Sequence, residues 1–531
     1  MQQDVQKMDS ILAEVVAKYL LGVTDEMSAA LMRTAFSPNI KERGDCSTAV
    51  FDRHGNVIAL PQRVPIHLGS MVGVIDEILK RYSRESLREG DMFLANDPYH
   101  GGGSHLPDIN LVSPVFHEGE VVAFVANIAH HSDVGGMVPG SEAAVCSSIF
   151  QEGLRLPPVR VASAGVINQD VLDIILLNSR TPQERQGDLK AQIAANTVGI
   201  RSVQDLYRRY GTERLSATIA SYLDFTERRF SAAISALPDG QYVARERMDD
   251  DLTGAQPELR LRLTVGRGKL HFDFEGTSPQ LASARNIPYR ALIATIYTVV
   301  KSLLDHEIAA NAGYFRTITV AAPPRSVVGP ESPAPVGARS LSCAVLGDLI
   351  VQAMNQAMPD RGMAGSGPHH LIVLAGEDPR NGSYFVNYET IAGAMGARAH
   401  RPGMDAVRVH ASGASNLPVE ALEHAYPLRV EQYAIRAGSG GEGWRRGGCG
   451  VIRDYRVLAN NAVLSLSTER QQFPARGVNG AGDGLPGEIW LDPETPQQRK
   501  LPSTAADIPV AYGQVLRVCT PGGGGHDGME D

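Results

Sequence analysis

The 531-residue sequence lacks several features that would by themselves assign a function class. Its five cysteines, at positions 46, 146, 343, 449 and 519, show no metal or redox spacing, so disulfides are not expected and a reducing compartment is. No apolar run reaches the length that spans a membrane. The polar amino-terminal residues lack the apolar core of a signal peptide. These absences predict a cytoplasmic protein without a membrane partner.

Basic clusters and nucleotide-binding loops are missing as well. The formal net charge of −9 and the lack of a Lys/Arg cluster argue against a nucleic-acid partner. The glycine-rich loops carry no Lys-Ser or Lys-Thr in P-loop register and no Gly-x-Gly-x-x-Gly between a clear strand and helix, so they are predicted to be turns. A Gly-x-Ser-x-Gly nucleophile elbow is absent too. Cys46 follows Asp45, whose carboxylate would raise a thiol pKa, and is predicted to be a packed side chain.

The composition is that of an ordinary globular protein, with 43% hydrophobic and 21% charged residues. The chain is too long for one core. We predict a multidomain α+β fold in three parts: an N-terminal domain with long helices over 1–236, a mixed β/α region over 237–330, and a glycine-rich, β-containing α/β region over 331–531. The first boundary is placed at the turn signal of residues 237–240. The second lies in a proline-rich connection that begins at Pro323.

Hydrophobic periodicity predicts the main elements. Helices are expected over 8–36, within 61–95 through about Tyr82, and over 169–235, 289–305 and 345–358. Pro182 is placed in the first turn of the helix that follows it. Residues 241–275 alternate as strands do, and short strands separated by glycines follow from Arg429 onward.

The segment from Asn96 to Gly136 concentrates imidazole and carboxylate side chains. Two apolar runs, 109–115 and 121–129, flank a polar segment with a glycine at 119, which predicts a β-hairpin. A turn centred there places Asp108 and His130 opposite each other at the open end, with Cβ atoms about 5 Å apart. One metal ion can bridge that separation.

A divalent metal site built from His105, Asp108 and His130 is the leading hypothesis for this segment. His105 stands three residues before Asp108, and Pro107 between them favours a turn. The alternative is a turn cap beside an exposed histidine, because His-x-x-Asp is far less specific than paired Cys-x-x-Cys motifs. Successive strand residues face opposite sides, so His131 and Asp133 are predicted to lie nearby without coordinating, and Asp97 is a further candidate neighbour.

A second hairpin is predicted from residues 46–51 and 57–60, joined by a turn at 54–56. Asp45 stands at its mouth, as Asp108 does in the later hairpin, and is a candidate fourth ligand. A local ion pair of Asp45 with Arg43 or Lys41 is an equally good interpretation of the sequence.

Several motifs resemble the B subunit of the hydantoinase/oxoprolinase enzymes. They cover nearly the whole chain in the family's order: Ser37-Pro38-Asn39-Ile40-Lys41-Glu42-Arg43, Asn96-Asp97-Pro98-Tyr99, Ser104-His105-Leu106-Pro107-Asp108, His131-Ser132-Asp133-Val134-Gly135-Gly136, Gln151-Glu152-Gly153-Leu154, Gly187-Asp188-Leu189-Lys190-Ala191-Gln192, Pro333-Ala334-Pro335-Val336-Gly337-Ala338-Arg339, Arg445-Arg446-Gly447-Gly448-Cys449-Gly450 and Thr520-Pro521-Gly522-Gly523-Gly524-Gly525. The combination is highly specific. The family includes N-methylhydantoinases, 5-oxoprolinases and caprolactamase, and it is related to acetone and acetophenone carboxylases.

The resemblance implies a partner and a cofactor. A B-type subunit works with a separate A-type subunit that binds ATP, in an A2B2 hetero-oligomer. It holds one divalent ion, Zn or Mn, and the family's ligand set corresponds to Asp45, His105, Asp108 and His130 here. Three segments depart from the family's usual form, at 309–313, 410–416 and 438–440. They lie outside the two hairpins and therefore put the substrate in question more than the metal.

Three functions follow as hypotheses. The first is the metal-containing subunit of an ATP-dependent hydrolase that opens a cyclic amide such as a hydantoin or lactam. The second is a subunit of an ATP-dependent ketone carboxylase. The third is a non-catalytic scaffold with a structural metal, which a mixed His/Asp ligand set does not favour.

Overall fold

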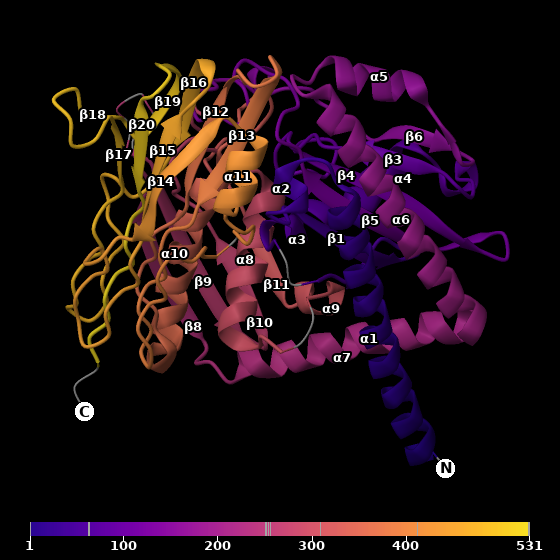
Figure 1. The fold of residues 1–531 in the computed structure, drawn as a ribbon. Coiled ribbons are helices and arrows are strands. Elements are labelled where there is room, and N and C mark those ends of the chain that lie inside the picture. Colours follow the sequence, from indigo (N-terminus) through magenta and orange to yellow (C-terminus); the bar gives the residue numbers. More distant parts are fainter. Residues whose placement is uncertain are drawn as a thin grey trace.

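The computed structural model describes residues 2–528 apart from 62–63, 250–251, 253, 255, 308–309 and 411. Ala309 and Ala411, from two of the segments that depart from the family form, lie outside the described residues. The described part combines helices with four β-sheets, which confirms the predicted mixture of helix and sheet (Figure 1). None of the described helices is long and apolar enough to cross a membrane.

The first sheet has seven strands in the order β2-β1-β5-β4-β3-β6-β7. Its strands are β1 (Cys46–Asp52), β2 (Val57–Ala59), β3 (Met92–Ala95), β4 (Asp108–His117), β5 (Glu120–His130), β6 (Val159–Ser163) and β7 (Val166–Ile167). Both predicted hairpins are confirmed, because β1 pairs with β2 and β4 with β5, each antiparallel. Asp108 pairs with His130, in the register expected from the turn at Gly119. Cys46 pairs with Ala129, so the two hairpins are joined and their mouths lie side by side.

Helices of the first half cover this sheet. They are α1 (Gln2–Thr34), α2 (Pro38–Lys41), α3 (Ile66–Met71), α4 (Val74–Arg81), α5 (Gln169–Leu177), α6 (Pro182–Tyr210) and α7 (Thr212–Ser235), with short 3₁₀ turns η1 (Arg84–Ser86) and η2 (Ile149–Gln151). Apolar residues of α1, α6 and α7 form one cluster with β1, β2 and β5, as their helical spacing predicts. Pro182 lies in the first turn of α6, as expected. In Figure 1, α1 runs past the sheet towards the N-terminus.

The helix expected to run through Tyr82 is interrupted, and that prediction is corrected to two helices. Val72 has an extended backbone after α3, and Gly73 has a φ of 77° at the start of α4. A side chain on Gly73 would meet the guanidinium of Arg290 at 2.4 Å. The chain therefore bends at a left-handed backbone angle that favours glycine, while the Arg290 guanidinium is the mobile end of a long side chain.

The second half contributes the other three sheets. The order β11-β10-β9-β8 contains β8 (Gly240–Arg247), β9 (Glu258–Gly266), β10 (Lys269–Asp273) and β11 (Ile318–Ala321). The order β13-β12-β16-β19 contains β12 (His370–Glu377), β13 (Tyr384–Ile391), β16 (Asn460–Ser467) and β19 (Thr504–Val510). The order β14-β15-β20-β17-β18 contains β14 (Leu428–Ile435), β15 (Val451–Val457), β17 (Glu488–Leu491), β18 (Arg499–Lys500) and β20 (Val515–Cys519). Their helices are α8 (Tyr289–Leu304), α9 (Ala312–Phe315), α10 (Arg339–Ala357), α11 (Val419–Ala425) and the 3₁₀ turn η3 (Pro359–Arg361).

The largest hydrophobic cluster runs from Ala49 to Met358 in sequence and joins α3, α8 and α10 with strands of the first two sheets. A separate cluster lies among the later strands, from Ile372 to Val518. The three-part division at 236 and 330 stays a prediction. The packing brings the start of α10 and strand β13 to the mouths of the two hairpins.

Candidate metal centre

Three side chains from the hairpin mouths meet in the interior. One ligand atom each from His105, Asp108 and His130 can be chosen so that all three lie within 4.8 Å of one another. His105 and Asp108 are fully buried, and His130 is 3% exposed. His105 Nε2, Asp108 Oδ1 and His130 Nε2 have no hydrogen-bond partner among the described residues. Burying three unpaired polar atoms is costly, so this cluster calls for a further partner.

His105 presents a lone pair to the cluster. Its Nδ1 lies 3.1 Å from the Gly337 carbonyl oxygen, which can only accept, so Nδ1 carries the hydrogen. Nε2 is then unprotonated in the neutral ring and lies 3.1 Å from Asp108 Oδ1. Burial, followed by the positive charge of Arg339, lowers the pKa of His105 and keeps the ring neutral. Two acceptor atoms therefore face each other with no hydrogen between them.

Asp108 is held as a carboxylate. Its Oδ2 accepts hydrogen bonds from Arg339 at 2.8 Å and from Ser104 Oγ at 3.0 Å. Burial alone would raise the pKa of Asp108, but the positive charge of Arg339 opposes it and helps to hold the pKa well below its ordinary value. Because Oδ2 is occupied, Oδ1 is the atom that remains for the cluster.

His130 is fixed by Asn39 and stacked against Tyr388. Asn39 Nδ2 donates to the His130 carbonyl at 2.8 Å and lies 3.0 Å from His130 Nδ1. The His130 and Tyr388 ring centroids are 4.4 Å apart. With Nδ1 accepting from Asn39, a neutral His130 carries its proton on Nε2, 3.6 Å from Glu142 Oε2. Coordination of a metal through Nε2 would require the ring proton to move to Nδ1, and the Asn39 amide to present its oxygen to that nitrogen.

Asp45 lines the same cavity but lies outside the three-atom group. Its Oδ1 is 3.7 Å from His67 Nε2, and the same nitrogen is 3.7 Å from Asp108 Oδ1. His67 thus stands between the two carboxylates, while its Nδ1 lies 3.1 Å from Ser47 Oγ. Arg43 instead hydrogen-bonds Asn39, Tyr388 and Thr390, so the local Arg43–Asp45 pair weighed from the sequence does not form.

His131, Asp133 and Asp97, the other predicted neighbours of the metal site, contact residues of the surrounding segments. His131 Nε2 lies 3.0 Å from Gln192 Oε1 on α6, and burial lowers its pKa to about 3. Asp133 pairs with Arg180 at 3.0 Å. Asp97 pairs with Arg155 at 2.6 Å. Each of the three is engaged with a residue outside the cluster.

Four residues of the site are not indicated by the sequence pattern: His67, Glu142, Arg339 and Tyr388. Arg339 stands more than 200 positions after Asp108, and Tyr388 donates to Glu142 Oε2 at 2.9 Å across 246 positions. Only long-range folding brings them together. His67 sits in a short buried helix whose pattern resembles any core helix. Only the family motifs that contain Ser104 and Arg339 could have pointed to Arg339 as a residue of the site.

The donor set suits a divalent cation. Neutral imidazoles and an ionised carboxylate are ligands for Zn²⁺ and Mn²⁺. A cation would satisfy the three unpaired atoms and separate the two facing lone pairs. The cavity beside them offers about 40 Å³ to water-sized molecules and is walled by residues of both halves, including Asp45, His67, Arg339, Tyr388 and Arg408.

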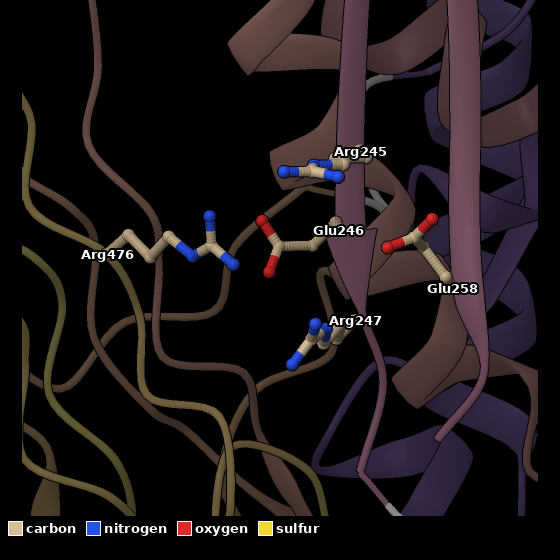
Figure 2. A pocket seen from close by; sticks show the side chains of 5 residues that line it. All are labelled: Arg245, Glu246, Arg247, Glu258 and Arg476. Carbon is tan, nitrogen blue, oxygen red and sulfur yellow. The ribbon is translucent and has the colours of Figure 1, made fainter. Parts of the chain in front are cut away.

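A second cavity, of about 190 Å³, has a different lining (Figure 2). Arg245, Glu246 and Arg247 come from β8, Glu258 from β9 and Arg476 from a loop, with Arg476 extending towards Glu246 (Figure 2). Both carboxylates already form ion pairs, Glu246 with Arg470 at 3.1 Å and Glu258 with Arg260 at 2.7 Å. Its lining offers no imidazole or thiol, so the hairpin cluster is the better candidate for chemistry.

Fold and site together define a mixed α/β protein with a buried His/Asp cluster at paired hairpin mouths. The chain belongs to the hydantoinase B/oxoprolinase family, whose match extends over residues 9–527. The resemblance seen in the sequence is thereby confirmed.

Relatives and solved structures agree with this assignment. The putative B-type subunit of a D-/L-hydantoinase from Pseudomonas sp. is 32% identical, over 98% of this chain and 90% of that protein. The 5-oxoprolinase 1 of Arabidopsis thaliana is 30% identical over 97% of this chain, which spans only 42% of that longer protein. The ATP-dependent caprolactamase of Pseudomonas jessenii superposes with a TM-score of 0.90 at 28% identity, covering 98% of this chain and 91% of its own. An acetone carboxylase also reaches 0.90, at 19% identity, covering 99% and 76%, which shows a shared fold alone.

Proposed function

We propose that this chain is the metal-bearing B-type component of an ATP-dependent hydrolase that opens cyclic amides. The observation that carries the proposal is the group of three buried, unpaired ligand atoms on His105, Asp108 and His130. The functions for which the relatives are named, hydantoinase, 5-oxoprolinase and caprolactamase, supply the reaction class. Asp45, which faces the same cavity, is proposed as the fourth ligand.

A lactam is a resonance-stabilised and therefore poor electrophile, which explains why ATP is needed. Phosphorylation of the amide oxygen or of bicarbonate would take place on a separate A-type subunit, since this chain shows no phosphate-binding motif. A divalent ion at the cluster would polarise a carbonyl or lower the pKa of a bound water.

The chain's own residues prepare the site for that ion. Gly337 fixes the tautomer of His105, and Arg339 with Ser104 keeps Asp108 ionised and oriented. Asn39 and Tyr388 fix the ring of His130. Such outer contacts typically change metal affinity or activity about 10- to 100-fold when removed.

The test combines metal analysis with an activity panel. The purified chain should contain close to one transition-metal ion, and with its A-type partner and ATP it should open at least one hydantoin or lactam. Chelation should abolish ring opening while leaving the subunits associated. Activity that persists in metal-free protein would contradict the proposal. Incorporation of labelled bicarbonate into a ketone, without ring opening, would favour the carboxylase branch.

A further inference from the structure

Two arginines beside the candidate metal site lack acidic partners. Arg43, which is 2% exposed, donates to Asn39 Oδ1, the Tyr388 carbonyl, Thr390 Oγ1 and the Ser415 carbonyl. Arg408 donates to the Oγ1 and carbonyl of Thr390 and to Ser412 Oγ. Every one of these acceptors is uncharged. Among the described residues, neither guanidinium forms an ion pair.

The two positive charges also lie close together. Both guanidinium groups donate to the same oxygen, Thr390 Oγ1. Like charges held close together repel each other unless an anion offsets them. Burial, and to a smaller extent the neighbouring Arg43, lower the pKa of Arg408 to about 9.

Arg408 opens onto the cavity of the metal cluster. Its side chain lines that cavity together with Asp45, Asp108 and His130. Its terminal nitrogens also donate to the Ser415 carbonyl and to Asn416 Oδ1, while its Nε has no hydrogen-bond partner among the described residues. The third arginine of the cavity wall, Arg339, is already committed to Asp108. Arg408 is therefore the arginine of the cavity wall that has no acidic partner among the described residues.

Asp45 is the carboxylate that faces Arg408 across this cavity, and its charge favours the protonated arginine. If a divalent ion binds, Asp45 and Asp108 serve that ion. Glu389, the other carboxylate that favours the protonated Arg408, is already paired with Arg453 at 2.8 Å. The occupied site would then carry an excess of positive charge. That excess selects for a negatively charged ligand.

We propose that Arg408, supported by Arg43, binds a small oxyanion group of the reacting molecule next to the metal cluster. This inference rests on the proposed function and names its ligand chemistry: a carboxylate on the cyclic amide, or a phosphoryl group added during activation. A guanidinium binds either group through charge-assisted hydrogen bonds.

Direct binding is the first test. Calorimetry on the purified chain, with and without bound metal, uses acetate and inorganic phosphate as probes. Arg408→Gln should weaken binding of at least one probe about tenfold or more, since a charge-assisted hydrogen bond is lost. Arg429→Gln, at an exposed arginine that pairs with Glu431 at 2.5 Å, is the matched control and should bind as wild type does. Equal binding by wild type and Arg408→Gln would overturn the proposal. Arg408→Met serves the same purpose if the glutamine variant does not fold.

Kinetics of the complex with its A-type partner separate the two sources of the anion. A KM that rises for 5-oxoproline but not for 2-pyrrolidone, the same ring without a carboxylate, assigns Arg408 to the substrate carboxylate. An equal fall in kcat for both lactams, with phosphate binding lost, assigns it to a phosphoryl group. Unchanged constants for both substrates would overturn the inference. Metal content, measured on the same samples, shows separately whether the proposed metal function has failed.

Discussion

His130, the last residue of β5, and His131, which follows it, face opposite sides and have different partners. His130 points to the cluster, whereas His131 lies against Gln192 of α6. We predict that His130→Ala loses both metal and activity, and that His131→Gln retains the metal because its contact is outside the cluster. Metal analysis of the two purified variants checks this. Loss of metal from the His131 variant alone would show that the strand alternation argument is wrong.

Glu152 is a buried acid beside the segment that holds His105. Its Oε1 accepts the amides of Val336 and Gly337, while Oε2 has no partner among the described residues. Burial raises its pKa from 4.5 to about 8. In that range the folded chain binds a proton that the unfolded chain has lost, so stability falls as pH rises.

The predicted slope is up to about 1.4 kcal/mol per pH unit between these two pKa values. Glu152→Gln keeps the acceptor oxygen and cannot ionise. Denaturant unfolding from about pH 5 to 8 should therefore show a flatter decline for the variant than for wild type. Parallel curves would mean that Glu152 is not protonated in the folded chain.

At the scale of elements, a close contact fixes the helix that carries His67. Gly69 of α3 packs on α8, and a Cβ there would lie 2.2 Å from the Arg290 carbonyl. Because backbone must move, Gly69→Ala should destabilise the chain by about 1–3 kcal/mol. Gly22 of α1 has nothing within 4 Å of the same position. Gly22→Ala should be neutral or stabilise the helix by up to about 1 kcal/mol. Urea unfolding of both variants measures the difference, and equal effects would contradict it.

Local signals explain which elements can be predicted from the sequence. The hairpin of β4 and β5 follows from two apolar runs and a glycine turn, and its register then places Asp108 opposite His130. The break before α4 occurs at the positive backbone angle of Gly73, and a single glycine in an apolar helical pattern does not by itself predict a break. The approach of Arg43 to Arg408 has no local signal in the sequence either. Their meeting at Thr390 is a product of tertiary packing, and no spacing rule connects residues so far apart.

At the scale of the whole molecule, the candidate site belongs to both halves of the chain. The hairpins supply the His and Asp side chains, and α10, β13 and the segment around Arg408 close the cavity over them. Neither half alone encloses the cluster. This arrangement explains why the family's motifs are spread over nearly the full length.

The division of labour between subunits gives the last prediction. The sequence of this chain shows no phosphate-binding motif. We therefore expect the purified chain alone neither to bind ATP tightly nor to hydrolyse it. Ring opening should appear only when the A-type subunit is added. Its rate should reach a plateau as the ratio of A-type subunit to this chain is increased. Calorimetry with ATP on the single chain checks the expected lack of tight binding. A micromolar affinity would contradict the prediction that the nucleotide binds to the A-type subunit.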